Sequence, residues 1–170
     1  VASVDVHSPV AGIVRDIATR PVPGPKGEGI CIVIQNDGSD DLENDFAPID
    51  WPSLASDDLL ARIRNAGIAG LGGAAFPAHA KLAAARERSA AHLVLNGAEC
   101  EPWICCDDAL MRERASDVVL GAQVFLHVCG AARCTIAIEG DKPEAIAAIE
   151  HALSATAEPR IELKTLRAIY

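Results

Sequence analysis

A glycine-rich stretch followed by one lysine is the first segment of this sequence whose residue types could bind a ligand. Residues 70–75, GLGGAA, match the pattern G-x-G-x-x-G/A of dinucleotide-binding loops. Glycines let the backbone approach a ligand closely, and a helix that begins near Pro77 would direct free N–H groups at the loop. Lys81 lies about one turn into that helix and could reach a phosphate. The usual fingerprint follows a strand, whereas a helix is expected here, so a simple helix–helix connection is the alternative.

A second polar segment, NGAECEP at residues 96–102, follows the apolar stretch HLVL, which we expect to be a short buried strand. Ligands of parallel α/β sheets bind at the carboxyl ends of strands. Asn96 offers both a donor and an acceptor, and Glu99 and Glu101 could accept hydrogen bonds from ribose hydroxyls or a carboxamide. The alternative is a turn with two solvated acids. Asp107 is a third candidate, and its alternative role is to cap the following helix.

Metal-ligand spacings are not found in the sequence. The five histidines are scattered, and the six cysteines form no C-x-x-C pair. The spacing C-x4-C-C at residues 100–106 does not fit the usual iron–sulfur runs. We therefore predict no metal site here and interpret the cysteines as free, partly buried thiols.

Composition and charge exclude several function classes. The 170-residue chain carries a net charge of -9, which argues against a nucleic-acid partner because phosphate binding needs clustered Lys and Arg. The most apolar stretch, Val118 to Ala132, is interrupted by Gln123 and His127 and is shorter than the roughly 20 residues of a membrane span. The sequence begins at Val1 without a signal-peptide pattern, so we expect a fragment or a processed product.

The elements that must position these residues are expected to form two domains. Residues 1–45 read as a β-rich domain, 46–56 as a linker, and 57–170 as an α/β domain. Within the second domain, helices alternate with strands, which predicts a parallel sheet with right-handed crossovers. We expect Ser56 to cap a helix over 57–65, a second helix to end near 88, and a third over 107–128 to break near Ser116. A further helix has Pro143 near its start, and the strands are expected at 92–96, 133–139 and 159–166.

Three segments occur in an order that resembles one family. GIAGLGGAAFPAHAKL, LNGAECEPWICCDDALM and IAIEGDKPEAI are similar to segments of the C subunit of the Rnf electron-transport complex. That protein is in turn similar to the flavin-bearing, NADH-binding subunit of respiratory complex I. The resemblance runs from about Leu59 to the end of the chain. VHSPVAGIVRDI extends it more loosely to the family's N-terminal, barrel-sandwich-like β domain.

The resemblance implies an FMN that accepts a hydride from NADH and passes single electrons to 4Fe–4S clusters. The cluster-binding cysteine runs and a later flavin loop would lie beyond Tyr170, so this fragment alone is expected to be inactive. Carried over by position, the residues around the FMN phosphate and ribityl chain are Gly70, Gly72, Gly73 and Lys81. Asn96 would contact the flavin ring, Phe76 would stack on the adenine of NADH, Glu99 and Glu101 would face NADH, and Asp107 would lie beside them.

Some positions depart from the pattern. Leu71 and Ala98 replace an Arg and an Asp of the complex I proteins, which fits the Rnf branch better, and Ala75 replaces a common glycine. The resemblance implies further that the partners are NADH and other subunits of a membrane complex. The protein would lie at the cytoplasmic, inner face of the bacterial cell membrane as a peripheral component without a membrane span of its own.

Three alternatives stay open. A flavin-dependent corrin reductase shares these motifs. HSPVAGIV is similar to lipoyl and biotinyl carrier modules, which need a lysine at a hairpin tip, and the only early lysine is Lys26 in a Pro/Gly loop. The third alternative is a scaffold surface of a membrane complex without a cofactor of its own.

Overall fold

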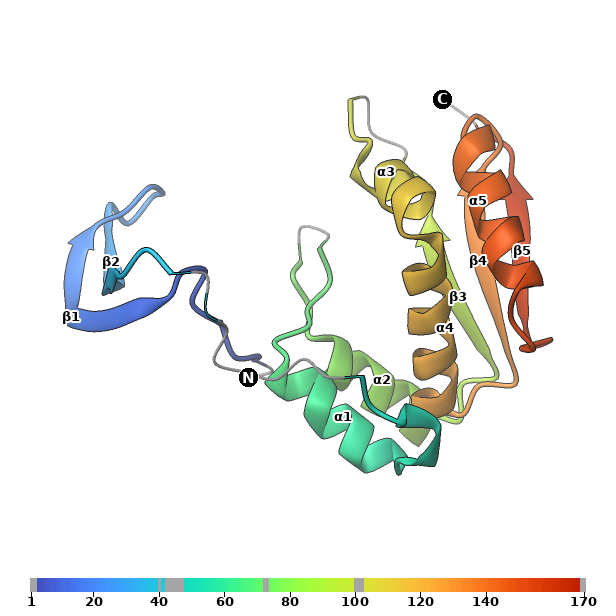
Figure 1. Cartoon of the computed structure of the whole chain (residues 1–170), viewed down its shortest axis with the longest axis horizontal. Helices are drawn as coiled ribbons and strands as arrows, with labels where there is room; N and C mark the ends of the chain where they lie inside the picture. The colour runs from blue at the N-terminus through green and yellow to red at the C-terminus, as the bar shows by residue number, and fades with distance from the viewer. Residues whose placement is uncertain (1–2, 40, 42–47, 72–73, 100–102, 169–170) are drawn as a thin grey trace. The chain divides into compact units, whose positions relative to one another are not determined.

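The computed structural model describes residues 3–39, 41, 48–71, 74–99 and 103–168 (Figure 1). Two compact units can be distinguished by their internal contacts: Val6–Ile49, and Asp50–Tyr170 together with Val1–Asp5. The domain boundaries expected at residues 45 and 57 stay predictions.

The first unit is an antiparallel hairpin. Strands β1 (Gly12–Pro21) and β2 (Glu28–Asn36) pair with Ile17 opposite Ile32, and a bulge lies between Val14 and Asp16. Residues 22–27 connect the strands, and Gly27 adopts a left-handed φ of 65° while its N–H donates to the carbonyl of Gly24. The expected β-rich start of the chain is confirmed. Ile17 and Ile32 remain 65% and 62% exposed, so the described residues of this unit bury little apolar surface.

The second unit contains a parallel three-stranded sheet, as predicted. Its strands β3 (His92–Gly97), β4 (Arg133–Glu139) and β5 (Ile161–Leu166) lie side by side in that order. Helices α3 (Cys106–Glu113) and α4 (Ala115–Cys129) connect β3 to β4, and α5 (Pro143–Ser154) connects β4 to β5 (Figure 1). The α/β class predicted from the alternating pattern is therefore confirmed.

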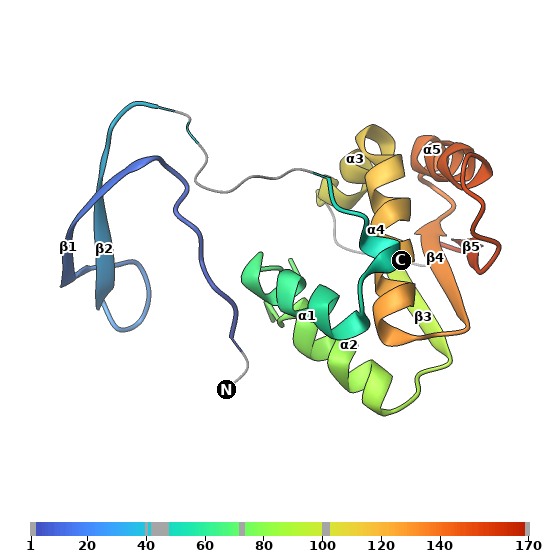
Figure 2. The ribbon, with the colours of Figure 1, turned by 60° about the horizontal axis from the view of Figure 1, so that its bottom comes forward.

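Helices cover one face of this sheet and build the core. Helices α4 and α5 pack against each other, α4 also against β4 and α5 against β5, while α1 (Ser56–Asn65) and α2 (Ala78–Glu87) pack against α4 (Figure 2). The short 3-10 helix η1 (Trp51–Ser53) joins them, and Trp51 contacts the His127 ring edge-on at 5.8 Å between centroids. The largest fully buried side chains are Leu126, Ile136, Ile138, Ile149, Val119, Val128 and Cys134.

Strand β3 is not buried as expected. Leu93 and Leu95 are half-buried against the core, whereas the alternate residues His92, Val94 and Asn96 are exposed, Val94 by 57%. Successive side chains of a strand point to opposite faces, and the described helices cover only one of them. On the uncovered face the Thr135 hydroxyl donates to Glu162 at 2.8 Å and lies 2.8 Å from the Nε2 atom of His92.

Helix ends follow the sequence signals unevenly. Pro143 occupies the first turn of α5 as predicted, and the break between α3 and α4 falls at Arg114, two residues before Ser116. The expectation for Ser56 is wrong. Ala55 is the capping residue of α1, and the Ser56 hydroxyl donates instead to the carbonyl of His127 at 3.3 Å, because α1 packs on α4 there.

None of the helices in the described part of the chain has the length and apolar character needed to cross a membrane. The longest of them, α4, has 15 residues.

Candidate functional site

The glycine-rich segment forms a loop that is closed at its base. An isolated bridge pairs Ala69 with Pro77, and it is framed by two backbone hydrogen bonds. Gly70 N–H donates to Phe76 O at 2.9 Å, and Ala78 N–H donates to Ile68 O at 3.0 Å. The loop is therefore a small hairpin between α1 and α2 rather than an extended connection. Gly72 and Gly73, which we predicted to be phosphate-binding, lie outside the described residues.

Ala75 stands in this loop at a backbone conformation that favours glycine. Its φ is 44°, in the left-handed region, where an alanine costs roughly 1–2 kcal/mol relative to its usual conformations. The glycine that relatives carry at this position, as the resemblance implies, would adopt this conformation without that cost. The strain therefore lies within the loop that we predicted to approach the ligand.

The N-terminus of α2 leaves backbone donors available beside this loop. Pro77 takes the capping position with a φ of -58°, one residue before the helix, and its carbonyl accepts from Lys81 N–H at 3.2 Å. Within the described ranges, the N–H groups of His79 and Ala80 have no acceptor. These donors and the helix dipole favour an anion at this end of α2.

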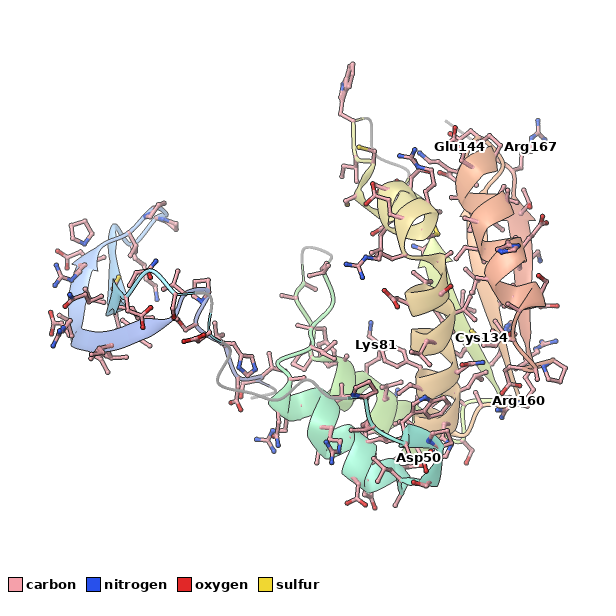
Figure 3. All side chains as sticks on the ribbon, in the orientation of Figure 1. Asp50, Lys81, Cys134, Glu144, Arg160 and Arg167 are labelled. Carbon is pink, nitrogen blue, oxygen red and sulfur yellow. The ribbon has the colours of Figure 1, made fainter. Side chains whose placement is uncertain are left out.

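Lys81 carries the positive charge nearest in sequence to these donors. Its side chain is exposed, and it rises from α2 on the same side as the loop (Figure 3). Phe76, at the end of the loop, is 46% exposed, so one part of its ring is free to stack on a planar ligand. The loop, the helix terminus, Phe76 and Lys81 thus form one group of predicted site residues.

Asn96 lies at the carboxyl end of β3, where a ligand of a parallel sheet is expected. Its Oδ1 atom accepts from Ala98 N–H at 3.1 Å, which turns the chain away from the strand. The amide nitrogen of Asn96 keeps its donors free of partners among the described residues. The next residue, Gly97, leaves no room for a side chain. A Cβ atom there would lie 2.9 Å from the sulfur of Met111 and 3.1 Å from the carbonyl of Ala137.

Glu99 is a buried carboxylate at the start of α3. Its side chain is 2% exposed. Oε1 accepts from Asp107 N–H at 2.7 Å, and Oε2 accepts from Asp108 N–H at 3.1 Å. Lys142, at the start of α5, places its Nζ atom 3.9 Å from Oε2. The Cys106 thiol lies 3.6 Å from Oε1 and donates weakly to it. Glu99 therefore connects the end of β3 to α3 and α5.

Asp107 does not cap α3. The capping position belongs to Cys105, whose side chain makes no capping hydrogen bond, and Glu99 supplies the acceptors from outside the helix. Asp107 lies in the first turn, half-buried, where a negative charge is favoured by the helix dipole. Glu101, the other predicted acid, lies outside the described residues.

A second set of charges fastens α3 to α5. Arg112 pairs with Asp108 at 3.1 Å and with Glu144 at 3.0 Å. The hydrogen bond to Glu144, followed by the charge of Asp108, raises the pKa of the Arg112 guanidinium. Because Glu99 contacts the first turn of α3 and Lys142, while Arg112 in the last turn contacts Glu144, α3 is linked to the start of α5 near both of its ends.

The predicted residues thus fall into two groups. One contains Gly70, Phe76 and Lys81, and the other contains Asn96, Glu99 and Asp107. No hydrogen bond or ion pair joins the two groups in the part of the chain that the structure describes, so their meeting in one site stays a prediction. A pocket of about 290 Å³ between the α3–α4 junction and α5, lined by residues such as Arg112, Arg114 and His151, contains none of the predicted site residues.

Sequence reasoning missed Lys142 and Asp108 as members of the second group. Lys142 lies within the quoted segment IAIEGDKPEAI, but Glu99 and Lys142 are far apart in sequence. Only the predicted parallel sheet could have pointed to Lys142. Neighbouring parallel strands bring the ends of β3 and β4 together, and with them the residues that follow each strand.

Comparisons with known proteins agree with this fold and these segments. The family model described as the Nuo51 FMN-binding domain, Complex1_51K, matches residues 63–170. Proteins named as the C subunit of the ion-translocating oxidoreductase complex are similar along most of the chain. The relative from Yersinia enterocolitica is 41% identical over 99% of this chain and 24% of its own length. The relative from Pseudomonas aeruginosa is 44% identical over 89% of this chain and 20% of its own length.

Solved structures show the same architecture in another protein. A NAD+-reducing [NiFe]-hydrogenase in its H2-reduced state matches with a TM-score of 0.55 and 24% identity, over 67% of this chain and 22% of that chain. Its air-oxidized state matches with a TM-score of 0.54 and 25% identity, over 67% of this chain and 21% of that chain.

This chain spans about a quarter of the length of the curated relatives it matches. The resemblance to the C subunit of the Rnf-type complexes is confirmed by these relatives. Because the Nuo51 FMN-binding domain model matches more than half of the chain, the chain belongs to that family.

Proposed function

We propose that this chain is part of an NADH-oxidising subunit of an ion-translocating oxidoreductase complex, in which electrons from NADH pass through FMN to iron–sulfur clusters. The family and the names of the relatives support an oxidoreductase subunit that binds FMN. The hydrogenase of similar fold is described as NAD+-reducing, which supports a nicotinamide nucleotide as the partner in hydride transfer. We place the 4Fe–4S clusters outside these 170 residues, because the chain spans only about a quarter of the length of its relatives.

The observation that carries the proposal is the pair of free N–H groups at the start of α2 beside Lys81. His79 and Ala80 present two backbone donors, and Lys81 adds a full positive charge one turn later. This combination of donors, helix dipole and cation favours a phosphate. We assign the terminal phosphate of FMN to these residues and, as the resemblance implies, place Gly70, Gly72 and Gly73 along the phosphate and ribityl chain. Bound flavin supplies the step from hydride transfer to single-electron transfer.

Residues of both groups orient the rings of the flavin and of NADH. The free amide donors of Asn96 suit the carbonyl oxygens of a flavin ring. Phe76 offers a half-exposed aromatic face for the adenine of NADH. Glu101 and Asp107 lie on the segment that follows Asn96 and accept hydrogen bonds from the nicotinamide nucleotide. Glu99 precedes Glu101 on this segment, and its carboxylate oxygens already accept backbone hydrogen bonds.

The partners follow from the same proposal. Reduced nicotinamide nucleotide is the soluble substrate, and other subunits of a membrane complex receive the electrons, as the names of the relatives suggest. We place the protein at the inner face of the bacterial cell membrane, because NADH is a cytoplasmic substrate. The 170-residue chain by itself is expected to be inactive, because a partial site loses enclosure and hydrogen bonds together.

Anaerobic flavin reduction tests this function. The protein is produced at the full length that its natural host makes, which is the longest natural form, and is then reconstituted with FMN, desalted and mixed with NADH. We expect stoichiometric flavin to remain after desalting and its absorption to bleach on addition of NADH. In Glu101→Gln the flavin should remain, while the KM for NADH rises. Protein that retains no FMN, or retained FMN that NADH does not reduce, would contradict the proposal.

One observation favours a second candidate function, a covalent carrier module. Lys26 lies in the connection between β1 and β2, which is the tip of a hairpin, as lipoyl and biotinyl carriers require. The intact mass of protein purified from its natural host separates the two functions. An added lipoyl or biotinyl mass at Lys26 would support the carrier, and the unmodified mass would exclude it.

A further inference from the structure

Both carboxylate oxygens of Glu99 already accept backbone N–H groups, at 2.7 Å from Asp107 and 3.1 Å from Asp108. With its side chain only 2% exposed, the carboxylate is also shielded from solvent. A carboxylate that is buried and hydrogen-bonded through both oxygens orders the backbone around it rather than binding a substrate from solvent.

Glu99 links two elements that follow each other along the chain, β3 and α3. Residue 99 lies two residues after the end of β3, and its hydrogen bonds reach the first turn of α3. The side chain therefore ties the end of β3 to the first turn of α3. That turn carries Asp107, which the proposed function assigns to the nicotinamide nucleotide.

Lys142 supports this tie from a third element. Its Nζ atom lies 3.9 Å from Oε2 of Glu99, and its side chain is 18% exposed. Lys142 lies three residues after the end of β4 and directly precedes α5, as its capping residue. A buried carboxylate needs hydrogen bonds and a nearby positive charge to offset its lost hydration, and Lys142 provides that charge.

We propose that Glu99 and Lys142 are positioning residues for the NADH site: the Glu99 carboxylate, with Lys142 as its counter-charge, joins the end of β3 to the start of α3 and so fixes the helical turn that carries Asp107. The inference rests on the proposed function, and it assigns Glu99 a role that acts through this turn instead of through contact with NADH.

Steady-state kinetics with an artificial electron acceptor give the first test. In the flavin-loaded, longest natural form, Lys142→Met should raise the KM for NADH about tenfold or more, because a displaced substrate-positioning segment loses alignment steeply. Its kcat at saturating NADH and its flavin content should change by less than about twofold. Lys142→Arg should restore the KM, since it keeps the charge. Lys164→Met, at an exposed lysine of β5, is the matched control and should behave as wild type.

Amide hydrogen exchange gives a second test that needs neither flavin nor NADH. Asp107 and Asp108 should exchange slowly in the wild type and at least tenfold faster in Glu99→Gln, in which the side-chain amide can no longer accept from both. Lys142→Met keeps the test informative if Glu99→Gln fails to fold.

The outcomes separate the two proposals. If NADH reduces the flavin but Lys142→Met leaves the KM unchanged, or Lys142→Arg does not restore it, the positioning role is overturned while the function stands. If the wild type does not oxidise NADH, the function fails, and the positioning role for an NADH site fails with it. Exchange at Asp107 and Asp108 that is already fast in the wild type would overturn the positioning role directly.

Discussion

Two strands of nearly the same composition lie in very different surroundings in this molecule. Strand β2 of the hairpin contains Cys31, Ile32 and Ile34, and strand β4 of the α/β unit contains Cys134, Ile136 and Ile138. Ile32 is 62% exposed, whereas Ile136 is 1% exposed. Apolar, β-branched residues predict a strand in both cases, but they do not determine how deeply it is buried.

The difference comes from the neighbours of each strand. Strand β4 lies between β3 and β5 and packs against α4, and six of its seven residues are buried. Strand β2 pairs with β1 alone in the described part of its unit. A two-stranded hairpin is marginally stable by itself in water, because it has no second layer to cover its apolar face. Stability therefore resides in the α/β unit.

Matched isoleucine truncations should show the largest difference between the two strands. Ile136→Ala should lower the free energy of unfolding of the α/β unit by about 2–5 kcal/mol, because it removes buried methyl groups and leaves a cavity. Ile32→Ala should change it by less than about 0.5 kcal/mol. Urea unfolding of the 170-residue chain, followed by circular dichroism, measures both. Equal losses for the two variants would contradict the assignment of the core.

Matched cysteine replacements should show a smaller, pH-dependent difference. Burial, and then the charge of Cys129, raise the pKa of the Cys134 thiol from 9.0 to about 11. The unfolded chain loses this proton near pH 9 and the folded chain near pH 11, so stability falls as pH rises between these values, by up to roughly 2–3 kcal/mol. Urea midpoints between pH 8 and pH 11 should fall less steeply in Cys134→Val than in wild type. Cys31→Val is the control, and a slope as shallow as that of Cys134→Val would contradict the account.

The smallest effect is expected from a surface ion pair of the hairpin. Arg20 and Asp16 approach to 2.9 Å, but their side chains are about half exposed, at 50% and 48%. Arg20→Gln should change the free energy of unfolding by less than about 0.5 kcal/mol, because exposed pairs contribute little after solvent screening. The same urea titration measures it. A loss above about 1 kcal/mol would show that the hairpin contributes to global stability.

The sequence predicted the fold where local signals and the final structure agree. The alternation of helices and strands predicted that β3, β4 and β5 form a parallel sheet, and Pro143 marked the start of α5. Ser56 has the chemistry of a capping residue, but α1 packs on α4, and the Ser56 hydroxyl donates to the carbonyl of His127 instead. The exposure of Val94 could not be read from an apolar stretch, because it depends on which face of the sheet is covered.

The candidate site was predictable as a set of segments but not as a network. The glycine loop and Lys81 follow a local pattern, so their place beside the start of α2 could be anticipated. The contacts of Glu99 with Asp108 and Lys142 depend on three elements that meet only after folding. No spacing in the sequence encodes such contacts. The sequence therefore predicted that Glu99 faces NADH, and it predicted no role for Lys142.

The affinity of the protein for FMN measures the central claim most directly, with Lys81→Ala compared against Lys164→Ala in the longest natural form. Removal of one charge-assisted hydrogen bond to the phosphate costs about 1.5–3 kcal/mol, so Lys81→Ala should raise the Kd for FMN roughly ten- to hundredfold. Lys164→Ala should leave the Kd unchanged. If Lys81→Ala binds FMN as tightly as the wild type, or if both lysine variants lose it equally, the start of α2 does not hold the flavin phosphate.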